Sequence, residues 1–171
     1  MSHDARFTLK PLTAAGIAAA LDKADQYRLL NQPWAAESIC SDVSAVVPGD
    51  RRALRTMLLA QTDQFAEDRG AVRRARDTLA RLTEPYEQAY YAGVIAERIA
   101  KASLLHHTPG AHFAAWDELR EAMAWYEKAE VLRPPGDDDA ILRWNTCARL
   151  LNSSPEIVPR GAEAAEPDIG D

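Results

Sequence analysis

The stretch LREAMAWYEKAEVLRPPGDD, residues 119–138, carries four residues at offsets of zero, four, seven and twelve: Ala122, Tyr126, Ala129 and Pro134. The first three share one face of a helix, and the proline ends that helix. Residues 33–50 read PWAAESICSDVSAVVPGD and repeat these offsets with Ala36, Cys40, Val43 and Pro48. A small residue at offset zero lets a neighbouring helix approach closely. The recurrence predicts a helical unit that occurs more than once in the chain.

The region between residues 12 and 152 shows the helical period almost throughout, without a convincing alternating β-branched run, so we expect an all-α fold. Breaks at proline and glycine divide it into about seven helices, around 13–31, 33–47, 51–65, 71–82, 86–105, 119–133 and 140–151. Thr13 and Asp50 are candidate N-caps of the first and third helices. Because the breaks are short, consecutive helices are expected to form antiparallel hairpins.

Three segments of different composition define the expected domain organisation. Residues 1–11 are expected to be a flexible N-terminus, and residues 12–152 a helical repeat domain of three irregular hairpins and a capping helix. Residues 153–171 contain three prolines, two glycines and few large apolar residues. Such a segment buries too little apolar surface to offset its ordering entropy, so we expect a disordered acidic tail.

The recurring unit resembles the tetratricopeptide repeat family, whose helix-turn-helix units span about 34 residues. The first unit matches the family pattern at Ala24, Tyr27, Ala36 and Pro48, with Cys40 in place of the aromatic residue. The last unit matches at all four positions of the opening stretch, and the helix before it offers Gly93 as the small residue and Ala96 where tyrosine is expected. The middle unit keeps Ala75, Leu79 and Leu82 but has no proline at offset twelve.

The spacing between units exceeds the family period in two places. Ala36 to Ala75 is 39 residues and Ala75 to Ala122 is 47, which are surpluses of five and thirteen over the repeat of about 34. The extra residues fall at DQFAEDRG, residues 63–70, and at a longer fifth helix followed by LLHHTPGAHF, residues 104–113. In the last helix, Trp144 replaces the small residue, which fits a capping helix; we expect Trp144 to be buried.

The resemblance implies a right-handed superhelical stack of helical hairpins, a TPR-like α-solenoid, that binds a peptide or partner protein on its concave surface. The implied function is that of a protein–protein interaction module or adaptor. Projection of the inner face from the small-residue register gives these candidate contacts: Asp25, Arg28, Arg52, Arg55, Tyr90, Glu97 and Asn145. The positions of the family's carboxylate clamp hold Leu21, Asp25, Arg52 and Thr56 instead of its lysines and asparagines, which argues against that clamp.

The charge distribution bears on a nucleic-acid alternative. The chain carries a net charge of −6, of which residues 155–171 contribute −4 and the other residues −2, whereas nucleic-acid binders usually have a strongly basic domain. The arginine-rich segment 51–81 is nevertheless a candidate nucleic-acid surface, although acidic residues interrupt it. Its arginines are Arg51, Arg52, Arg55, Arg69, Arg73, Arg74, Arg76 and Arg81.

A metal-binding accessory role is a further alternative, because HHTPGAH places His106, His107 and His112 close together in a loop. A specific site needs three or four convergent ligands, and neither cysteine nor a suitably spaced carboxylate stands nearby, so we expect neither a metal nor another cofactor.

Catalysis has little support in the sequence. Cys40 and Cys147 lie in apolar helical stretches without a histidine at readable spacing, which predicts buried, reduced thiols. Glu84, Glu87 and Glu97 are candidate paired carboxylates, but the phosphate-binding, HExxH and GxSxG motifs are missing, and we expect no enzyme.

The remaining features concern location and association. The N-terminus has no secretory-signal pattern, and no run approaches the roughly 18 apolar residues of a membrane helix, so we expect a cytoplasmic protein. Sixteen arginines against four lysines, with abundant alanine, are typical of a GC-rich bacterial genome. Homo-oligomerisation is open, because repeat stacks expose apolar ends; Trp34 and Trp116 are candidate staple or interface residues.

Overall fold

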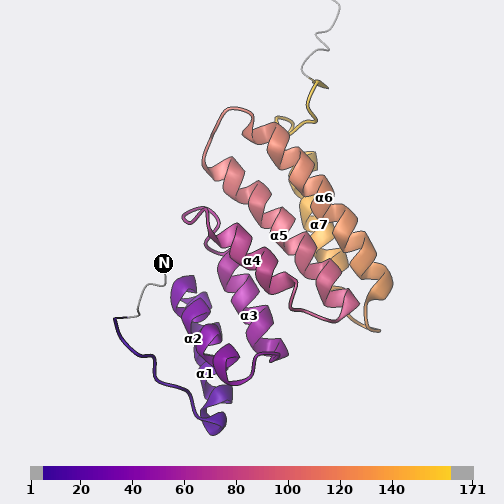
Figure 1. Cartoon of the computed structure of the whole chain (residues 1–171). Helices are drawn as coiled ribbons and strands as arrows, with labels where there is room; N and C mark the ends of the chain where they lie inside the picture. Colours follow the sequence, from indigo (N-terminus) through magenta and orange to yellow (C-terminus); the bar gives the residue numbers. More distant parts are fainter. Residues whose placement is uncertain (1–5, 163–171) are drawn as a thin grey trace, which may run out of the picture. The chain divides into compact units, whose positions relative to one another are not determined.

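The computed structural model describes residues 6–162, which contain helices and no strand, so the predicted all-α class is confirmed (Figure 1). A short 3₁₀ turn at Ala14–Gly16 precedes seven α-helices: α1 (Ile17–Leu29), α2 (Pro33–Val46), α3 (Arg51–Thr62), α4 (Ala71–Leu79), α5 (Pro85–Leu105), α6 (Ala111–Leu132) and α7 (Asp139–Ser153). None of the helices in this described part combines the length and apolar character needed to cross a bilayer.

The chain divides into two compact units, with the boundary between Gln61 and Thr62. The first unit packs α1, α2 and α3 around one apolar core. Its buried members are Leu21 and Ala24 from α1, Ala36, Cys40 and Val43 from α2, and Ala53, Met57 and Ala60 from α3. Most of these are small residues, so the three helices are held at close range and the recurring small positions serve packing.

Local signals place the helix ends in the first unit. The Asp50 carboxylate accepts a hydrogen bond from the Ala53 amide at 2.7 Å, which confirms the predicted cap of α3. α1 ends at Leu29, and Asn31, two residues later, has a left-handed φ of 56°, which lets the Gln32 amide donate back to the Tyr27 carbonyl at 2.8 Å. The predicted Thr13 cap is wrong: its side chain makes no capping bond, because the 3₁₀ turn stands between Thr13 and α1.

The second unit contains α4 to α7, and α5 and α6 form its longest hairpin (Figure 1). The two helices approach closely at Gly93, where an added Cβ would lie 2.6 Å from the Tyr126 ring. Ala122, Tyr126 and Ala129 are all fully buried, as their spacing predicts. Proline and glycine again set the ends, with Pro85 as the first residue of α5 and Gly110, at a φ of 79°, before α6.

Three peripheral features bear on the sequence expectations, and Trp144 differs from its prediction. Trp144 is only half-buried, because its indole Nε1 donates to the exposed Glu127 carboxylate at 3.0 Å and so holds one ring edge near solvent. Trp34, a candidate staple or interface residue, is 67% exposed. Within the segment expected to be a disordered tail, Ile157 is buried in a turn after α7, while residues 163–171 lie outside the described part, as do residues 1–5 of the expected flexible N-terminus.

Replacement of Gly93 by valine is expected to destabilise the chain by about 2–3 kcal/mol, because the buried Tyr126 ring cannot retreat from the new side chain. Urea unfolding followed by circular dichroism measures the change. Gly49→Val is the control, since no atom lies within 4 Å of a Cβ at this exposed position, and a change within about 0.5 kcal/mol is expected. Equal losses in the two variants would contradict the close approach.

Candidate functional site

Two of the predicted contact residues of the first unit, Asp25 and Arg52, bind each other. Arg52 reaches the Asp22 carboxylate at 2.7 Å and the Asp25 carboxylate at 2.8 Å, and Thr56 donates to Asp25 at 3.0 Å. The hydrogen bonds that Arg52 donates to Asp25 and, second, to Asp22 raise its pKa. Arg28 and Arg55 are half-buried on α1 and α3. Asp25 and Arg52 therefore link α1 to α3 within this unit.

In the second unit, two predicted contacts, Tyr90 and Glu97, meet three residues that were not predicted as contacts: Lys101 on α5, Tyr126 on α6 and Arg143 on α7. Of these three, Tyr126 was predicted only as a packing residue. These five residues are called the Glu97 cluster. Offsets of seven and four along α5 place its Tyr90, Glu97 and Lys101 on one helix face. The predicted Asn145 is half-buried on α7, two residues after Arg143, and residues two apart on a helix do not share a face.

Glu97 is the centre of the cluster, and its side chain is 1% exposed. Tyr126 donates its hydroxyl hydrogen to Oε2 at 2.6 Å, and Arg143 donates to the same oxygen at 3.3 Å. Lys101 donates to Oε1 one helical turn along α5. Arg143 also donates through Nε to the Tyr90 hydroxyl at 3.3 Å. One carboxylate thus ties three helices together.

The electrostatics of the cluster keep its charges in place. Burial acts to raise the pKa of Glu97, but the hydrogen bonds from Lys101 and Tyr126 and the charges of Lys101 and Arg143 outweigh burial, and the pKa is lowered. Burial and the neighbouring Glu97 raise the pKa of Tyr126. Burial acts to lower the pKa of Arg143, while the bond to Tyr90 and the charge of Glu97 raise it overall. One anion and two cations give the cluster a net charge of about +1 at neutral pH.

The exposed side of the cluster combines cations with aromatic rings. The side chains of Lys101 and Arg143 are 41% and 28% exposed. The Tyr90 ring stacks on Tyr86 with centroids 5.9 Å apart and lies 6.0 Å from the Tyr126 ring. Such an arrangement offers charge-assisted hydrogen-bond donors beside an apolar wall, which suits a carboxylate next to apolar groups.

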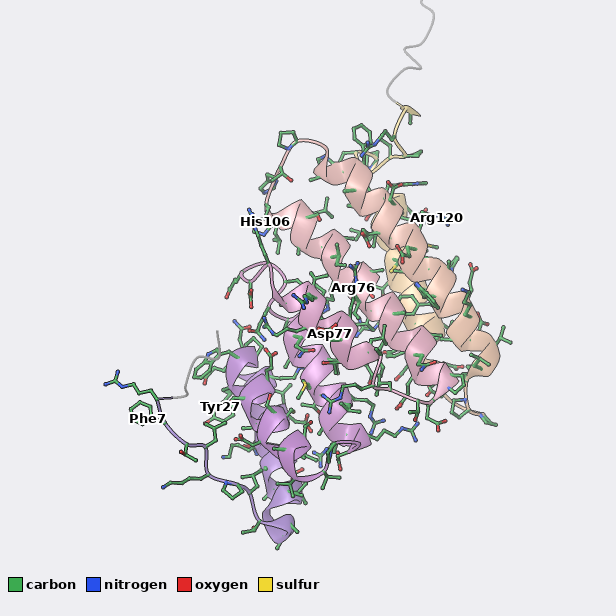
Figure 2. All side chains as sticks on the ribbon, in the orientation of Figure 1. Phe7, Tyr27, Arg76, Asp77, His106 and Arg120 are labelled. Carbon is green, nitrogen blue, oxygen red and sulfur yellow. The ribbon has the colours of Figure 1, made fainter. Side chains whose placement is uncertain are left out.

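Two arginines of the candidate nucleic-acid surface at residues 51–81 pair with neighbouring carboxylates. Arg74 binds Asp68 at 2.8 Å, and this hydrogen bond, with one from the Gly70 amide, lowers the pKa of Asp68. Arg73 faces Asp77 at 4.0 Å on the exposed side of α4, where Figure 2 labels Asp77 beside Arg76. Around α4, therefore, the positive charge of Arg73 and Arg74 is interleaved with negative charge.

The described residues do not bring the three loop histidines together as a set of metal ligands. His106, His107 and His112 are all exposed, and within residues 6–162 no group of three metal-ligating side chains gathers. The loop contributes instead to two separate cavities, one lined by His106 and the other by His112.

Neither the two thiols nor the pair of Glu87 and Glu97 has the arrangement of a reactive group. Both cysteines are free and buried, as predicted, and burial is the main reason that the pKa of each thiol is raised to about 12, the opposite of what a nucleophile needs. Glu87 and Glu97 are separated by ten residues of α5, about 15 Å along the axis. They cannot act together on one bond.

No protein-family model matches the chain, and neither the curated proteins nor the solved structures contain a significant match to it.

Glu97→Gln is expected to lower stability by about 3 kcal/mol at pH 7, because the buried Tyr126 hydroxyl and two half-buried cations lose their ionised acceptor. Since the pKa of Glu97 is lowered in the folded chain, its contribution is complete above the ordinary glutamate value of about 4.3 and is lost as the pH falls through the lowered value. Urea unfolding between pH 7 and pH 3 should show that the difference in the free energy of unfolding between Glu97→Gln and wild type shrinks below about pH 4. Tyr126→Phe keeps the ring and should cost about 1–3 kcal/mol. If the difference in stability between Glu97→Gln and wild type does not change with pH, the ionised Glu97 carboxylate is not the stabilising centre of the cluster.

Both thiols should be alkylated by iodoacetamide at pH 8 at least 100-fold more slowly in the native chain than in urea, because a pKa of about 12 leaves only ~10⁻⁴ of each as thiolate. Mass spectrometry of timed digests follows Cys40 and Cys147 separately. Native alkylation of either at the unfolded rate would contradict its burial.

Proposed function

We propose that this protein is a non-catalytic interaction module whose second unit binds an acidic segment of a partner protein on the surface shared by α5 and α7. The observation that carries the proposal is the Glu97 cluster, in which two partly exposed cations share one fully buried carboxylate beside stacked tyrosines. An incoming carboxylate would meet Lys101 and Arg143 without displacing Glu97, which lies beneath them.

Charge favours an acidic partner over a basic one. The cluster carries a net charge of about +1 within a chain of net charge −6, so it is a local positive feature against a negative background. Because such a contact is partly exposed, its strength should fall as salt is added. Tyr90 and Tyr86 would hold apolar groups next to the bound carboxylate.

We further propose that the helices form a TPR-like α-solenoid, with the odd-numbered helices on its inner surface. A relation that recurs in each unit supports this arrangement: a carboxylate on one odd-numbered helix bonds an arginine on the next. Asp25 on α1 pairs with Arg52 on α3, and Glu97 on α5 pairs with Arg143 on α7. Gly93 against Tyr126 supplies the small-to-aromatic contact that the repeat pattern requires.

Selection of a random decapeptide library on the immobilised chain is expected to enrich acidic sequences. Lys101→Gln should weaken the best peptide by about tenfold or more, because a charge-assisted hydrogen bond contributes about 1.5–3 kcal/mol. Fluorescence anisotropy with the labelled peptide at several salt concentrations measures the loss.

Lys128→Gln is the matched control for this experiment, since Lys128 is an exposed cation on α6 that lies over the Trp125 ring at 4.2 Å and is not one of the five residues of the cluster. Circular dichroism checks that both variants remain folded. Failure to enrich acidic peptides, or equal weakening by the two variants, would overturn the proposed function.

A further inference from the structure

A cavity of about 530 Å³ lies in the second unit between the loop after α3, the start of α4 and the last turns of α5. Figure 2 shows His106 near this α3–α4 loop, just after the end of α5. The cavity volume falls within the roughly 300–1,000 Å³ typical of small-molecule sites. Its lining residues are apolar or small (Phe65, Ala66, Val72, Ile99, Ala102) and polar (Glu67, Arg69, Ser103, His106, Thr108).

The lining comes largely from the residues that exceed the repeat period. Residues 63–70 hold the surplus of five and supply four lining side chains, while residues 104–113 supply two more. The prolonged C-terminal half of α5 supplies Ile99, Ala102 and Ser103. In repeat folds, insertions map to loops on one face, where binding is often found. Two insertions distant in sequence thus converge on a single cavity.

Ion pairs hold the insertion loop in place, so the cavity is formed before any ligand arrives. Asp63 binds Arg98 of α5 at 3.4 Å, which fixes the beginning of the loop. Asp68 binds Arg74 of α4 at 2.8 Å and accepts the Gly70 amide at 2.8 Å, which fixes its end. Phe65, between these anchors, is 7% exposed and packs inward. A preformed site loses less entropy on binding than a mobile loop would.

The polar groups of the lining carry both signs of charge at an otherwise apolar site. Arg69 supplies a forked cation that suits a carboxylate, and Ser103 and Thr108 supply hydroxyl donors. Glu67 supplies an anion two residues from Arg69, which suits an ammonium group. Phe65, Val72 and Ile99 supply an apolar surface for the body of the ligand.

We propose that this cavity binds a small zwitterion with an apolar body, of the class of large apolar α-amino acids. The carboxylate of the ligand pairs with Arg69, its ammonium group pairs with Glu67, and its side chain lies against Phe65, Val72 and Ile99. A ligand that lacks the ammonium group leaves Glu67 without a partner, and a ligand that lacks the carboxylate leaves Arg69 without one. Either ligand therefore binds more weakly. This site is separate from the Glu97 cluster and does not depend on the proposed partner binding.

Isothermal titration of the full chain with L-phenylalanine and L-leucine tests the proposal. Both amino acids should bind with submillimolar Kd, and 3-phenylpropanoate and phenethylamine, which lack the ammonium and the carboxylate respectively, should each bind at least tenfold more weakly than phenylalanine. Arg69→Gln and Glu67→Gln should each weaken phenylalanine at least tenfold.

Arg73→Gln is the control, because its side chain is 90% exposed on α4 and lies outside the lining; its Kd should equal that of wild type. Absence of binding at 10 mM amino acid would overturn the proposal. So would equal affinity for phenylalanine and the singly charged analogues, or unchanged affinity in both the Arg69 and Glu67 variants.

Discussion

A buried carboxylate needs hydrogen-bond donors and positive charge, and this requirement organises the second unit around Glu97. A charge taken out of water without partners would cost several kcal/mol, so α6 and α7 must deliver Tyr126 and Arg143 to the same two oxygens. The pairing specifies which helix faces meet and at what height along α5. Apolar contacts among alanines alone would tolerate a slide of one turn, whereas the carboxylate does not.

The same constraint explains why Gly93 and the small residues matter. Tyr126 can reach Glu97 only if its ring crosses α5 at very short range, and the absence of a side chain at Gly93 permits that crossing. Packing and polar bonding therefore depend on each other at this point. In the first unit the corresponding polar link, from Asp25 to Arg52, lies nearer to solvent, so it adds less to stability than its short distance implies.

Lys101 and Arg143 bind the buried Glu97 carboxylate and are also partly exposed to solvent. The same two side chains can therefore serve both the fold and the proposed binding. Lys101 and Arg143 are held in fixed orientations by Glu97, so a partner carboxylate would meet preorganised donors and lose little side-chain entropy. The cavity beside His106 relies on a comparable principle, since ion pairs from α4 and α5 fix the loop that lines it. In both the Glu97 cluster and the cavity, ion pairs within the chain fix the side chains that the proposed ligand would contact.

The sequence by itself determined the helical class, the cap of α3 at Asp50, the burial of the small residues at repeat positions, and the burial of both thiols. These depend on local backbone chemistry and on helical period, which one chain segment expresses alone. The sequence predicted Tyr90 and Glu97 as contact residues but did not predict Arg143. For Lys101 the only sequence signal was its i, i+4 spacing from Glu97. It misjudged Thr13 and Trp144, whose surroundings depend on a turn and on a neighbouring helix. The tertiary structure decided which distant side chains share the Glu97 carboxylate and that residues 63–70 and 104–113 line one cavity, because such meetings depend on how helices pack across long sequence separations.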